Sequence, residues 1–230
     1  MTSRIHVMIV VGARPQFIKS APLMGEMLSE HRRIELSMIH SGQHYDPEMS
    51  EIFFHQLQIP RPFMNLQAGS GSHARQTATM MERLEDPTLR TRPDVVIVPG
   101  DTNTTLAAAL TAAKIGVPVA HVEAGLRSSD MTMPEEINRR LTDHCSTMLF
   151  APTQTAANNL KMEGLGRLTY LTGDTMVDTL RIATPFVERN QNTVLERLRL
   201  TPREYVLVTL HRPSNVDNVS RLHAIFLALR

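Results

Sequence analysis

Short apolar runs alternate with helix-length segments along most of this chain, and this alternation restricts the fold more than any other sequence feature. The apolar runs are rich in β-branched residues and lie at 5–11, 34–40, 95–99, 117–122, 148–151 and 168–171. Helical spacing or good helix formers occupy 17–28, 48–57, 77–84, 104–115, 135–143 and 153–162. Strands that alternate with helices form parallel sheets covered by helices. The sequence therefore predicts an α/β fold with a doubly wound, Rossmann-like parallel sheet.

The strand rhythm is lost toward the C-terminal end. Residues 184–202 are polar and helix-like, the apolar run 205–210 predicts a new strand, and a helical pattern follows at 219–229. We expect an N-terminal Rossmann-like domain over 1–185, a linker region over 186–203 and the beginning of a second, truncated Rossmann-like lobe over 204–230. One strand and one helix cannot bury a core of their own. This tail therefore either packs on the first domain or belongs to a longer, two-lobed protein.

Composition argues against several classes of protein. The 24 basic and 23 acidic residues leave a net charge of +1, so the whole chain lacks the basic footprint of a nucleic-acid or membrane-surface binder. The first apolar run contains His6 and is followed by Gly12 and Arg14, unlike a signal peptide, and no run approaches the roughly 20 residues that cross a bilayer. The single Cys145 excludes an intrachain disulfide and favours a packed thiol in a reducing compartment. We expect a soluble, cytoplasmic protein.

Ligands of open α/β sheets bind beyond the carboxyl ends of the strands, so the loops after each predicted strand are the first place to look for chemistry. The loop after 5–11 combines Gly12, Pro15 at a helix start, and the cations Arg14 and Lys19. This set suits an anion site at a helix N-terminus, and it equally suits a capped helix with two solvated cations. The loop matches neither a dinucleotide-binding nor a Walker motif, so it predicts neither NAD nor ordinary ATP binding.

Two further loops carry polar candidates. His40 and His44 are four residues apart, but the Ser-Gly turn between them breaks the helical geometry that a metal pair would need, which favours a loop histidine. After the run 95–99, Asp101 and Thr102 enter an alanine-rich helix, where either side chain also suits an N-cap.

Acidic side chains are further candidates for the predicted site. Alternation places His121 and Glu123 on one face of a strand end, where a shielded carboxylate can act as an acid or base. Glu135 and Arg139 open a helix four residues apart, a spacing that a surface ion pair alone explains. The convergence of separate loops on one sheet edge favours a site for proton transfer beside a departing phosphate. Its members are Asp101, Glu123, Glu135, Arg14, Lys19 and Arg139.

Six fragments, taken in their order and spacing, resemble the non-hydrolysing UDP-N-acetylglucosamine 2-epimerases of bacteria and archaea. They are GARP at 12–15 with Lys19, GQHY at 42–45, GDTN at 100–103, HVEAGLR at 121–127, PEEINR at 134–139 and HRPSN at 211–215. The resemblance covers nearly the whole chain and implies a GT-B-type fold of two Rossmann lobes. It also implies reversible epimerisation at C2 of UDP-N-acetylglucosamine to UDP-N-acetylmannosamine, by elimination and re-addition of UDP, with no cofactor or metal.

The resemblance further implies roles for individual residues. The catalytic candidates are Asp101, Glu123, Glu135 and His211, and the substrate-binding candidates are Arg14, Lys19, Arg139, His44 and Thr102. The expected partners are a UDP-sugar and a second copy of the chain, without nucleic acid or membrane.

Other functions fit the same motifs. They are a UDP-diacetamido-sugar 2-epimerase, a hydrolysing epimerase, a GT-B glycosyltransferase and a non-catalytic, truncated lobe that only binds its ligand. In the family, a second lobe supplies most contacts to uridine and diphosphate, and this chain ends one helix into that lobe. We therefore expect the full-length parent to be an epimerase and the 230-residue form, if complete, to be weak or inactive.

Overall fold

The computed structural model describes residues 4–43, 59–210 and 213–229 of the chain. Its contacts divide the chain into two compact units, residues 1–183 and residues 184–230, which are described separately. The predicted helix at 48–57 lies outside the described residues.

The first unit is built on a parallel sheet of seven strands in the order β3-β2-β1-β4-β5-β6-β7. The strands are β1 (Ile5–Val11), β2 (Ile34–His40), β3 (Met64–Asn65), β4 (Val95–Pro99), β5 (Val119–Val122), β6 (Met148–Ala151) and β7 (Thr169–Leu171). The strand order reverses between β1 and β4, which places the topological switch point there. This sheet confirms the predicted α/β, Rossmann-like fold class.

Helices follow the strands in the predicted alternation. They are α1 (Arg14–Ser29), α3 (His73–Thr91), α4 (Asn103–Lys114), α5 (Pro134–Cys145), α6 (Gln154–Met162) and α7 (Thr175–Leu198), with a 3-10 turn at Gly166–Leu168. Helix α3 is much longer than the predicted 77–84. It continues past Pro87, where helices often end, and the hydroxyls of Thr88 and Thr91 bond to the carbonyls of Leu84 and Pro87.

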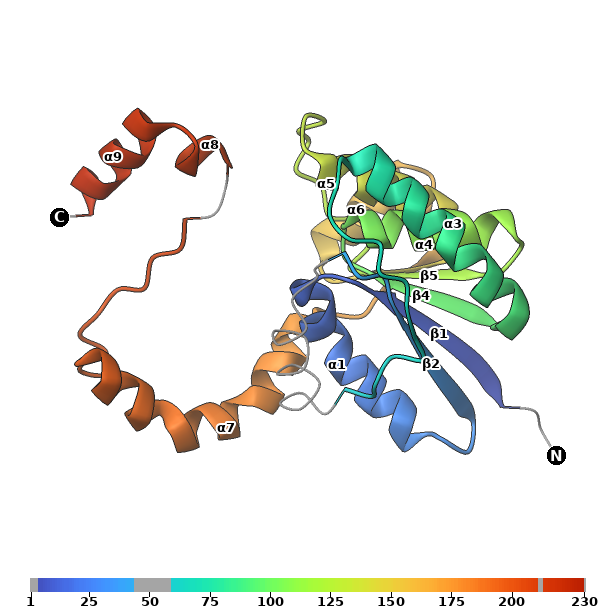
Figure 1. Ribbon diagram of the computed structural model, residues 1–230, viewed down its shortest axis with the longest axis horizontal. Coiled ribbons are helices and arrows are strands. Elements are labelled where there is room, and N and C mark those ends of the chain that lie inside the picture. The colour runs from blue at the N-terminus through green and yellow to red at the C-terminus, as the bar shows by residue number, and fades with distance from the viewer. Residues whose placement is uncertain (1–3, 44–58, 211–212, 230) are drawn as a thin grey trace. The chain divides into compact units, whose positions relative to one another are not determined.

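Helices cover both faces of the sheet, and Figure 1 shows α1 on one side and α3 and α4 on the other. The hydrophobic core therefore has two parts, one on each face. Val7, Ile9 and Val11 of β1 pack with Phe17 and other residues of α1. Met8 and Val10, which point the opposite way along the same strand, pack with residues of α3 and α4. Both faces of β1 are therefore apolar, which explains why its sequence is a continuous hydrophobic run.

One strand was not predicted, and one predicted strand is absent. Strand β3 is only two residues long and exposed, and it pairs with β2 through Ile39 opposite Met64. The predicted strand at 205–210 is wrong, because this segment has no regular structure and its Val206 and Leu207 are 86% and 81% exposed. An apolar, β-branched run becomes a strand only where a neighbouring strand can pair with it.

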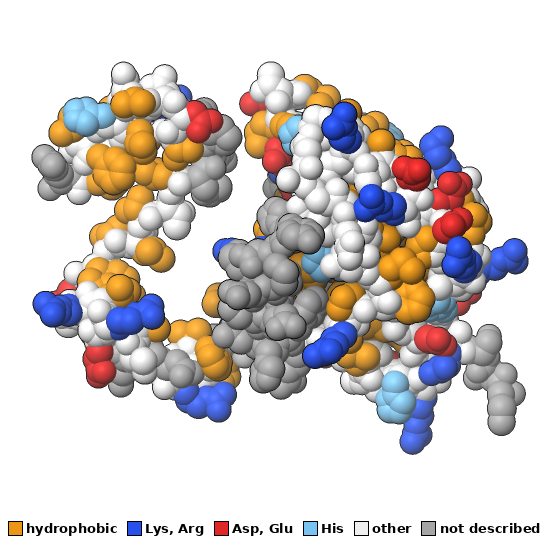
Figure 2. Space-filling model, in the orientation of Figure 1, with side chains coloured by type: hydrophobic (Ala, Val, Ile, Leu, Met, Phe, Trp, Pro, Cys, Tyr) orange, Lys and Arg blue, Asp and Glu red, His pale blue; other side chains and the backbone are white. Residues whose placement is uncertain are grey.

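The second unit contains the part of α7 from residue 184 onward, α8 (Pro213–Val216) and α9 (Val219–Ala228). Helix α9 confirms the helix predicted at 219–229. The side chain of Asn218 caps α9 by accepting a hydrogen bond from the main-chain nitrogen of Arg221 at 3.0 Å. No residue of α9 is buried, and its Phe226 is 57% exposed. Figure 2 shows hydrophobic side chains on the surface of this part of the chain. Among the described residues, no helix has the length and apolar character needed to cross a membrane.

Candidate active site

The loops that follow β1, β4 and β5 meet at the switch point of the sheet. Gly100 is the first residue after β4 and has a φ of +72°. A Cβ atom built on Gly100 would lie 3.5 Å from the Nζ atom of Lys19 and 3.7 Å from the Oε2 atom of Glu123. The structure therefore brings Lys19, Glu123 and the loop of Asp101 together, as the sheet topology predicts.

Lys19 and Glu123 form an ion pair at this edge. Both side chains are well shielded, at 15% and 16% exposure. The prediction that His121 and Glu123 share a strand face was wrong, because β5 ends at Val122 and Glu123 has a left-handed φ of 74°. That conformation costs a residue with a side chain about 1–2 kcal/mol, and such residues concentrate at functional sites.

Asp101 pairs with Arg139 across the same edge. The Nη2 atom of Arg139 lies 2.6 Å from the Oδ2 atom of Asp101, and the Nδ2 atom of Asn138 donates to the carbonyl of Asp101 at 2.9 Å. Arg139 also pairs with Glu136 at 3.2 Å, so its ion-pair partners are Asp101 and Glu136 and the alternative explanation, a surface pair with Glu135, does not hold. Glu135 is exposed in the first turn of α5.

Glu136 was missed by the sequence reasoning, although it is fully buried. It accepts hydrogen bonds from the main-chain nitrogen of Ser128 at 2.8 Å and from the Nε atom of Arg140 at 3.0 Å, besides its contact with Arg139. Burial favours the neutral acid, but hydrogen bonds from Ser128, Arg140 and Arg139 outweigh it and lower the pKa of Glu136 to about 2. Glu136 is therefore an ionised anchor for the two arginines.

His121 is also completely buried, beneath the loop that carries Gly100. Its Nδ1 atom lies 2.6 Å from Asp143 and its Nε2 atom lies 2.7 Å from the carbonyl oxygen of Gly100. Asp143 accepts further hydrogen bonds from Arg127 at 2.7 Å and from the main-chain nitrogen of Gly125 at 3.1 Å. The sequence offered the pattern of a strand-end histidine but no sign of its partner Asp143.

Gln16 connects the loop after β1 to the loop after β4. The sequence reasoning did not identify this residue. Its Oε1 atom accepts hydrogen bonds from the main-chain nitrogens of Gly12 and Ala13 at 2.9 and 3.0 Å. Its Nε2 atom donates to the carbonyl of Pro99 and to the hydroxyl of Thr105, both at 3.0 Å. The available signal was a glutamine in the first turn of a helix, where it can cap main-chain donors.

The other predicted site residues are Arg14, Thr102, His44 and His211. Arg14 is the first residue of α1 and is exposed, and Thr102 is the N-cap of α4, accepting from the main-chain nitrogen of Thr105 at 3.4 Å. His44 and His211 lie outside the described residues.

Within the described ranges, no three His, Cys, Asp or Glu side chains are grouped so that they could hold a metal ion. Cys145 is a free, partly buried thiol, and burial raises its pKa, which disfavours the reactive thiolate.

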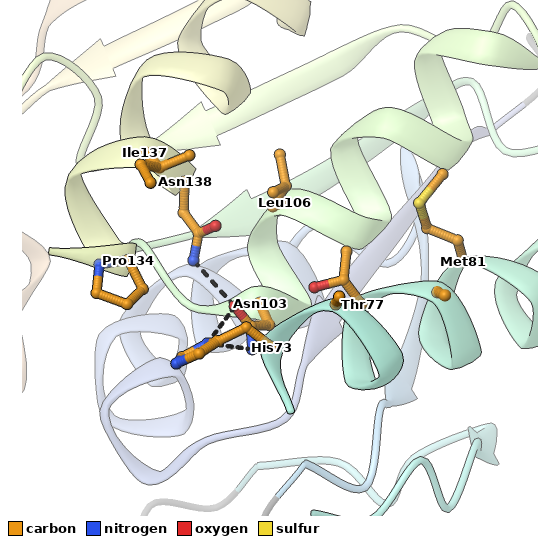
Figure 3. A pocket seen from close by; sticks show the side chains of 10 residues that line it. His73, Thr77, Met81, Asn103, Leu106, Pro134, Ile137 and Asn138 are labelled. Carbon is orange, nitrogen blue, oxygen red and sulfur yellow. Dashed lines mark hydrogen bonds between the residues drawn. The ribbon is translucent and has the colours of Figure 1, made fainter. Parts of the chain in front are cut away.

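An open, mostly apolar pocket of about 370 Å³ lies where the first turns of α3, α4 and α5 approach one another (Figure 3). Asn103 lies in this pocket and hydrogen-bonds to His73, Gln76 and Asn138, at 3.1, 2.8 and 3.3 Å. Asn138 joins the pocket to the site, because it also binds the carbonyl of Asp101.

The family model and the relatives that match this chain all point to the same protein family. The family whose sequence model is described as UDP-N-acetylglucosamine 2-epimerase matches residues 26–230. A UDP-N-acetylglucosamine 2-epimerase homolog of Methanococcus maripaludis is 48% identical over 224 residues, which are 97% of this chain and 62% of the relative. The UDP-2,3-diacetamido-2,3-dideoxy-D-glucuronate 2-epimerase of Pseudomonas aeruginosa is 44% identical over 229 residues, 98% of this chain and 62% of the relative.

A solved structure agrees with these relatives. The crystal structure of Methanocaldococcus jannaschii UDP-GlcNAc 2-epimerase in complex with UDP-GlcNAc and UDP has a TM-score of 0.88 and 46% sequence identity, and the match covers 98% of this chain and 62% of that one. The chain thus spans about three fifths of the length of the relatives it matches. Because the family match extends over most of its residues, the chain belongs to the UDP-N-acetylglucosamine 2-epimerase family.

Proposed function

We propose that the protein is an isomerase that reversibly inverts C2 of UDP-N-acetylglucosamine to give UDP-N-acetylmannosamine, using elimination and re-addition of UDP. The observation that carries the proposal is the meeting of two carboxylate–cation pairs, Lys19 with Glu123 and Arg139 with Asp101, at the carboxyl edge of the sheet. Family membership and the relative solved with UDP-GlcNAc and UDP support the same substrate class.

The chemistry of the substrate explains why such pairs suit the reaction. The hydrogen on C2 is not next to a carbonyl, so its removal alone would leave an unstabilised carbanion. If the bond from C1 to the diphosphate oxygen breaks as the proton leaves, the C–H electron pair becomes the C1–C2 double bond and UDP departs with the C–O pair. Proton return to the other face of C2, with re-addition of UDP at C1, completes the inversion without an oxidant or reductant.

We assign roles by these requirements. Glu123 and Asp101 are proposed to remove and return the C2 proton, since each carboxylate stands beside a cation and comes from a different loop. Arg14, at the start of α1, and the cations Lys19 and Arg139 are proposed to stabilise the departing diphosphate. Glu135 and His211 are kept as further catalytic candidates, and His44 and Thr102 as substrate contacts.

The test follows turnover of UDP-N-acetylglucosamine in deuterated water by NMR, with this 230-residue chain and with a longer form that supplies a second lobe. The expected product is UDP-N-acetylmannosamine that carries deuterium at C2, and Glu123→Gln should abolish the exchange. Arg61→Gln, outside the proposed site, serves as the control variant. Release of free N-acetylmannosamine and UDP would favour a hydrolysing epimerase, and epimer without deuterium would refute the elimination route.

A second substrate is supported by a specific comparison. The 44% identity to the Pseudomonas aeruginosa relative makes a UDP-diacetamido uronic acid the main competing substrate. A side-by-side measurement of kcat/KM for the two UDP-sugars separates them. Homodimerisation and a cytoplasmic location complete the proposal, and sedimentation velocity together with cell fractionation tests them.

A further inference from the structure

A closed ring of charged side chains begins and ends at the peptide between Gly100 and Asp101. From Asp101 the contacts run in order through Arg139, Glu136, Arg140, Glu163, Arg127, Asp143 and His121, which returns to the carbonyl of Gly100. The contacts range from 2.6 Å between Asp101 and Arg139 to 3.5 Å between Arg140 and Glu163. Acids and bases alternate along the series, so each side chain between Asp101 and His121 touches two ring neighbours of the opposite kind.

The protonation of His121 follows from its two contacts. The carbonyl oxygen of Gly100, 2.7 Å from Nε2, can only accept a hydrogen bond. The ionised carboxylate of Asp143, 2.6 Å from Nδ1, also accepts only, and hydrogen bonds from Arg127 and the main-chain nitrogen of Gly125 to its other oxygen favour that ionised form. Both ring nitrogens must therefore donate, which requires an imidazolium.

The surroundings of Asp143 favour its ionised form. Burial alone would raise the pKa of Asp143, yet the hydrogen bonds and charges of His121 and Arg127 outweigh it and lower that pKa below its usual value. In the sheet, His121 lies in register with Val98 of β4 and Leu149 of β6, which carry no charge. The ring contains four carboxylates and three arginines, so a cationic His121 offsets the remaining negative charge. The exposed His144 also reaches Glu163, at 3.5 Å.

The ring holds Asp101 from both sides. The carbonyl of Gly100 accepts from His121, and its main-chain nitrogen donates to the carbonyl of Val122 at 3.0 Å, so both polar groups of this residue are bonded to β5. On the other side, the carboxylate of Asp101 meets Arg139. A small displacement of Gly100 would move Asp101 relative to Glu123.

We propose that His121 is a positioning residue, an imidazolium with both ring nitrogens bonded, that sets the Gly100–Asp101 peptide for catalysis without touching the substrate. The catalytic part of this inference rests on the function proposed above. Its structural part, the charged ring, stands on the contacts alone.

The first experiment records the ring nitrogens of His121 by NMR in the chain labelled with ¹⁵N-histidine. We expect protons on both nitrogens at neutral pH, because both nitrogens face hydrogen-bond acceptors. The exposed His31 serves as an internal reference, because its ring protons exchange rapidly with water. A His121 ring with one bare nitrogen would overturn the proposal, whether or not the protein turns over any sugar.

The second experiment compares His121→Gln with the double variant His121→Gln/Asp143→Asn. In the single variant, the new glutamine can donate to Gly100 only by turning its carbonyl oxygen toward the carboxylate of Asp143. In the double variant, the new asparagine can donate to the new glutamine, and the glutamine can donate to Gly100, which restores the hydrogen-bond chain without charge. The single variant should shift the main-chain amide signals of Gly100 and Asp101, and the double variant should return them toward the wild-type positions.

If the wild-type chain epimerises its substrate, the same variants can also be compared by their kcat. His121→Gln should lower kcat by about 100-fold with little change in KM, since misplacing a reacting group by about 1 Å has that effect, and the double variant should recover part of the loss. His31→Gln should leave kcat unchanged. A folded His121→Gln protein with unshifted amides and full kcat would refute the positioning role, whereas an inactive wild type with a doubly protonated His121 would refute only the proposed function.

Discussion

At the residue scale, the site depends on charges that are buried and yet ionised. Glu136 is 0% exposed, and its carboxylate lies against two arginines and the main-chain nitrogen of Ser128. A buried charge is tolerated only when such partners satisfy it, and removing one member leaves the others unpaired. The buried anchor Glu136 therefore matters more for stability than its exposed neighbour Glu135.

Glu136→Gln should lower the free energy of unfolding by on the order of 3 kcal/mol at neutral pH. The pKa of Glu136 is depressed from 4.5 to about 2 in the folded chain, so its contribution is complete above pH 4.5 and is lost as the pH falls toward 2. Urea unfolding at a series of pH values measures this, and the gap between variant and wild type should narrow below about pH 4.5. Glu135→Gln is the control, and a gap that is equal at all pH values would contradict the explanation.

Gly12 is required for a steric reason. A Cβ atom on Gly12 would lie 1.8 Å from the Oγ atom of Ser41 and 2.5 Å from the Oγ1 atom of Thr104, both buried. We expect Gly12→Ala to lower the free energy of unfolding by about 1–3 kcal/mol, the usual cost of overpacking. Gly71→Ala, where nothing lies within 4 Å of the added atom, should leave stability nearly unchanged. Thermal unfolding of both variants measures the difference. Equal melting temperatures for the two variants would contradict this reason.

At the element scale, α1 and α4 are joined by side chains below the site, not only by the sheet between them. Gln16 of α1 satisfies two main-chain donors after β1 and reaches the end of β4 and the first turn of α4. Thr104 of α4 bonds to Ser41, which follows β2, at 2.8 Å. These bonds set the position of α1, which carries Lys19, relative to the loop that carries Asp101.

Gln16→Leu tests this connection. The variant keeps an apolar shape of similar size but leaves buried main-chain groups unsatisfied, each at a cost of about 1–3 kcal/mol. We expect a loss of more than about 2 kcal/mol in unfolding free energy. We also expect shifted amide signals at both Gly12 and Gly100, the residue after Pro99. Gln154→Leu, on the exposed surface of α6, is the matched control, and a loss no larger than that of the control would show that Gln16 does not join the loops.

Elements were predictable from sequence where the signal was local. Strands β1, β2, β4 and β6 have the predicted bounds because runs rich in apolar or β-branched residues end there at glycine, serine or proline. The meeting of the loops followed from parallel topology, but the pairings did not. Arg139 selects Asp101, 38 positions away, over Glu135 at helical spacing, and Lys19 pairs with Glu123 across 104 positions. Such choices depend on tertiary geometry, which spacing along a chain does not contain.

At the scale of the whole molecule, the two units differ in how much they bury. Helix α4 of the first unit has nine buried residues among twelve, whereas α9 of the second unit has none. The segment 205–210 that precedes α8 and α9 has the composition of a strand but no strand to pair with among the described residues. The second unit therefore has hydrophobic sequence without a core of its own.

Hydrogen exchange should make this difference visible. An isolated helix shorter than about 12–15 residues is marginal in water, and α9 has 10 residues and no buried side chain to stabilise it. We expect the amides of α9 to exchange within seconds, while those of α4 remain protected for as long as the first unit stays folded. Mass spectrometry of peptides from the two helices measures this, with the equally short but partly buried α6 as the control for length. Protection of α9 equal to that of α4 would mean that its apolar face is covered in solution. Repeating the measurement across protein concentrations would then show whether a second copy of the chain covers it, because only that protection increases with concentration.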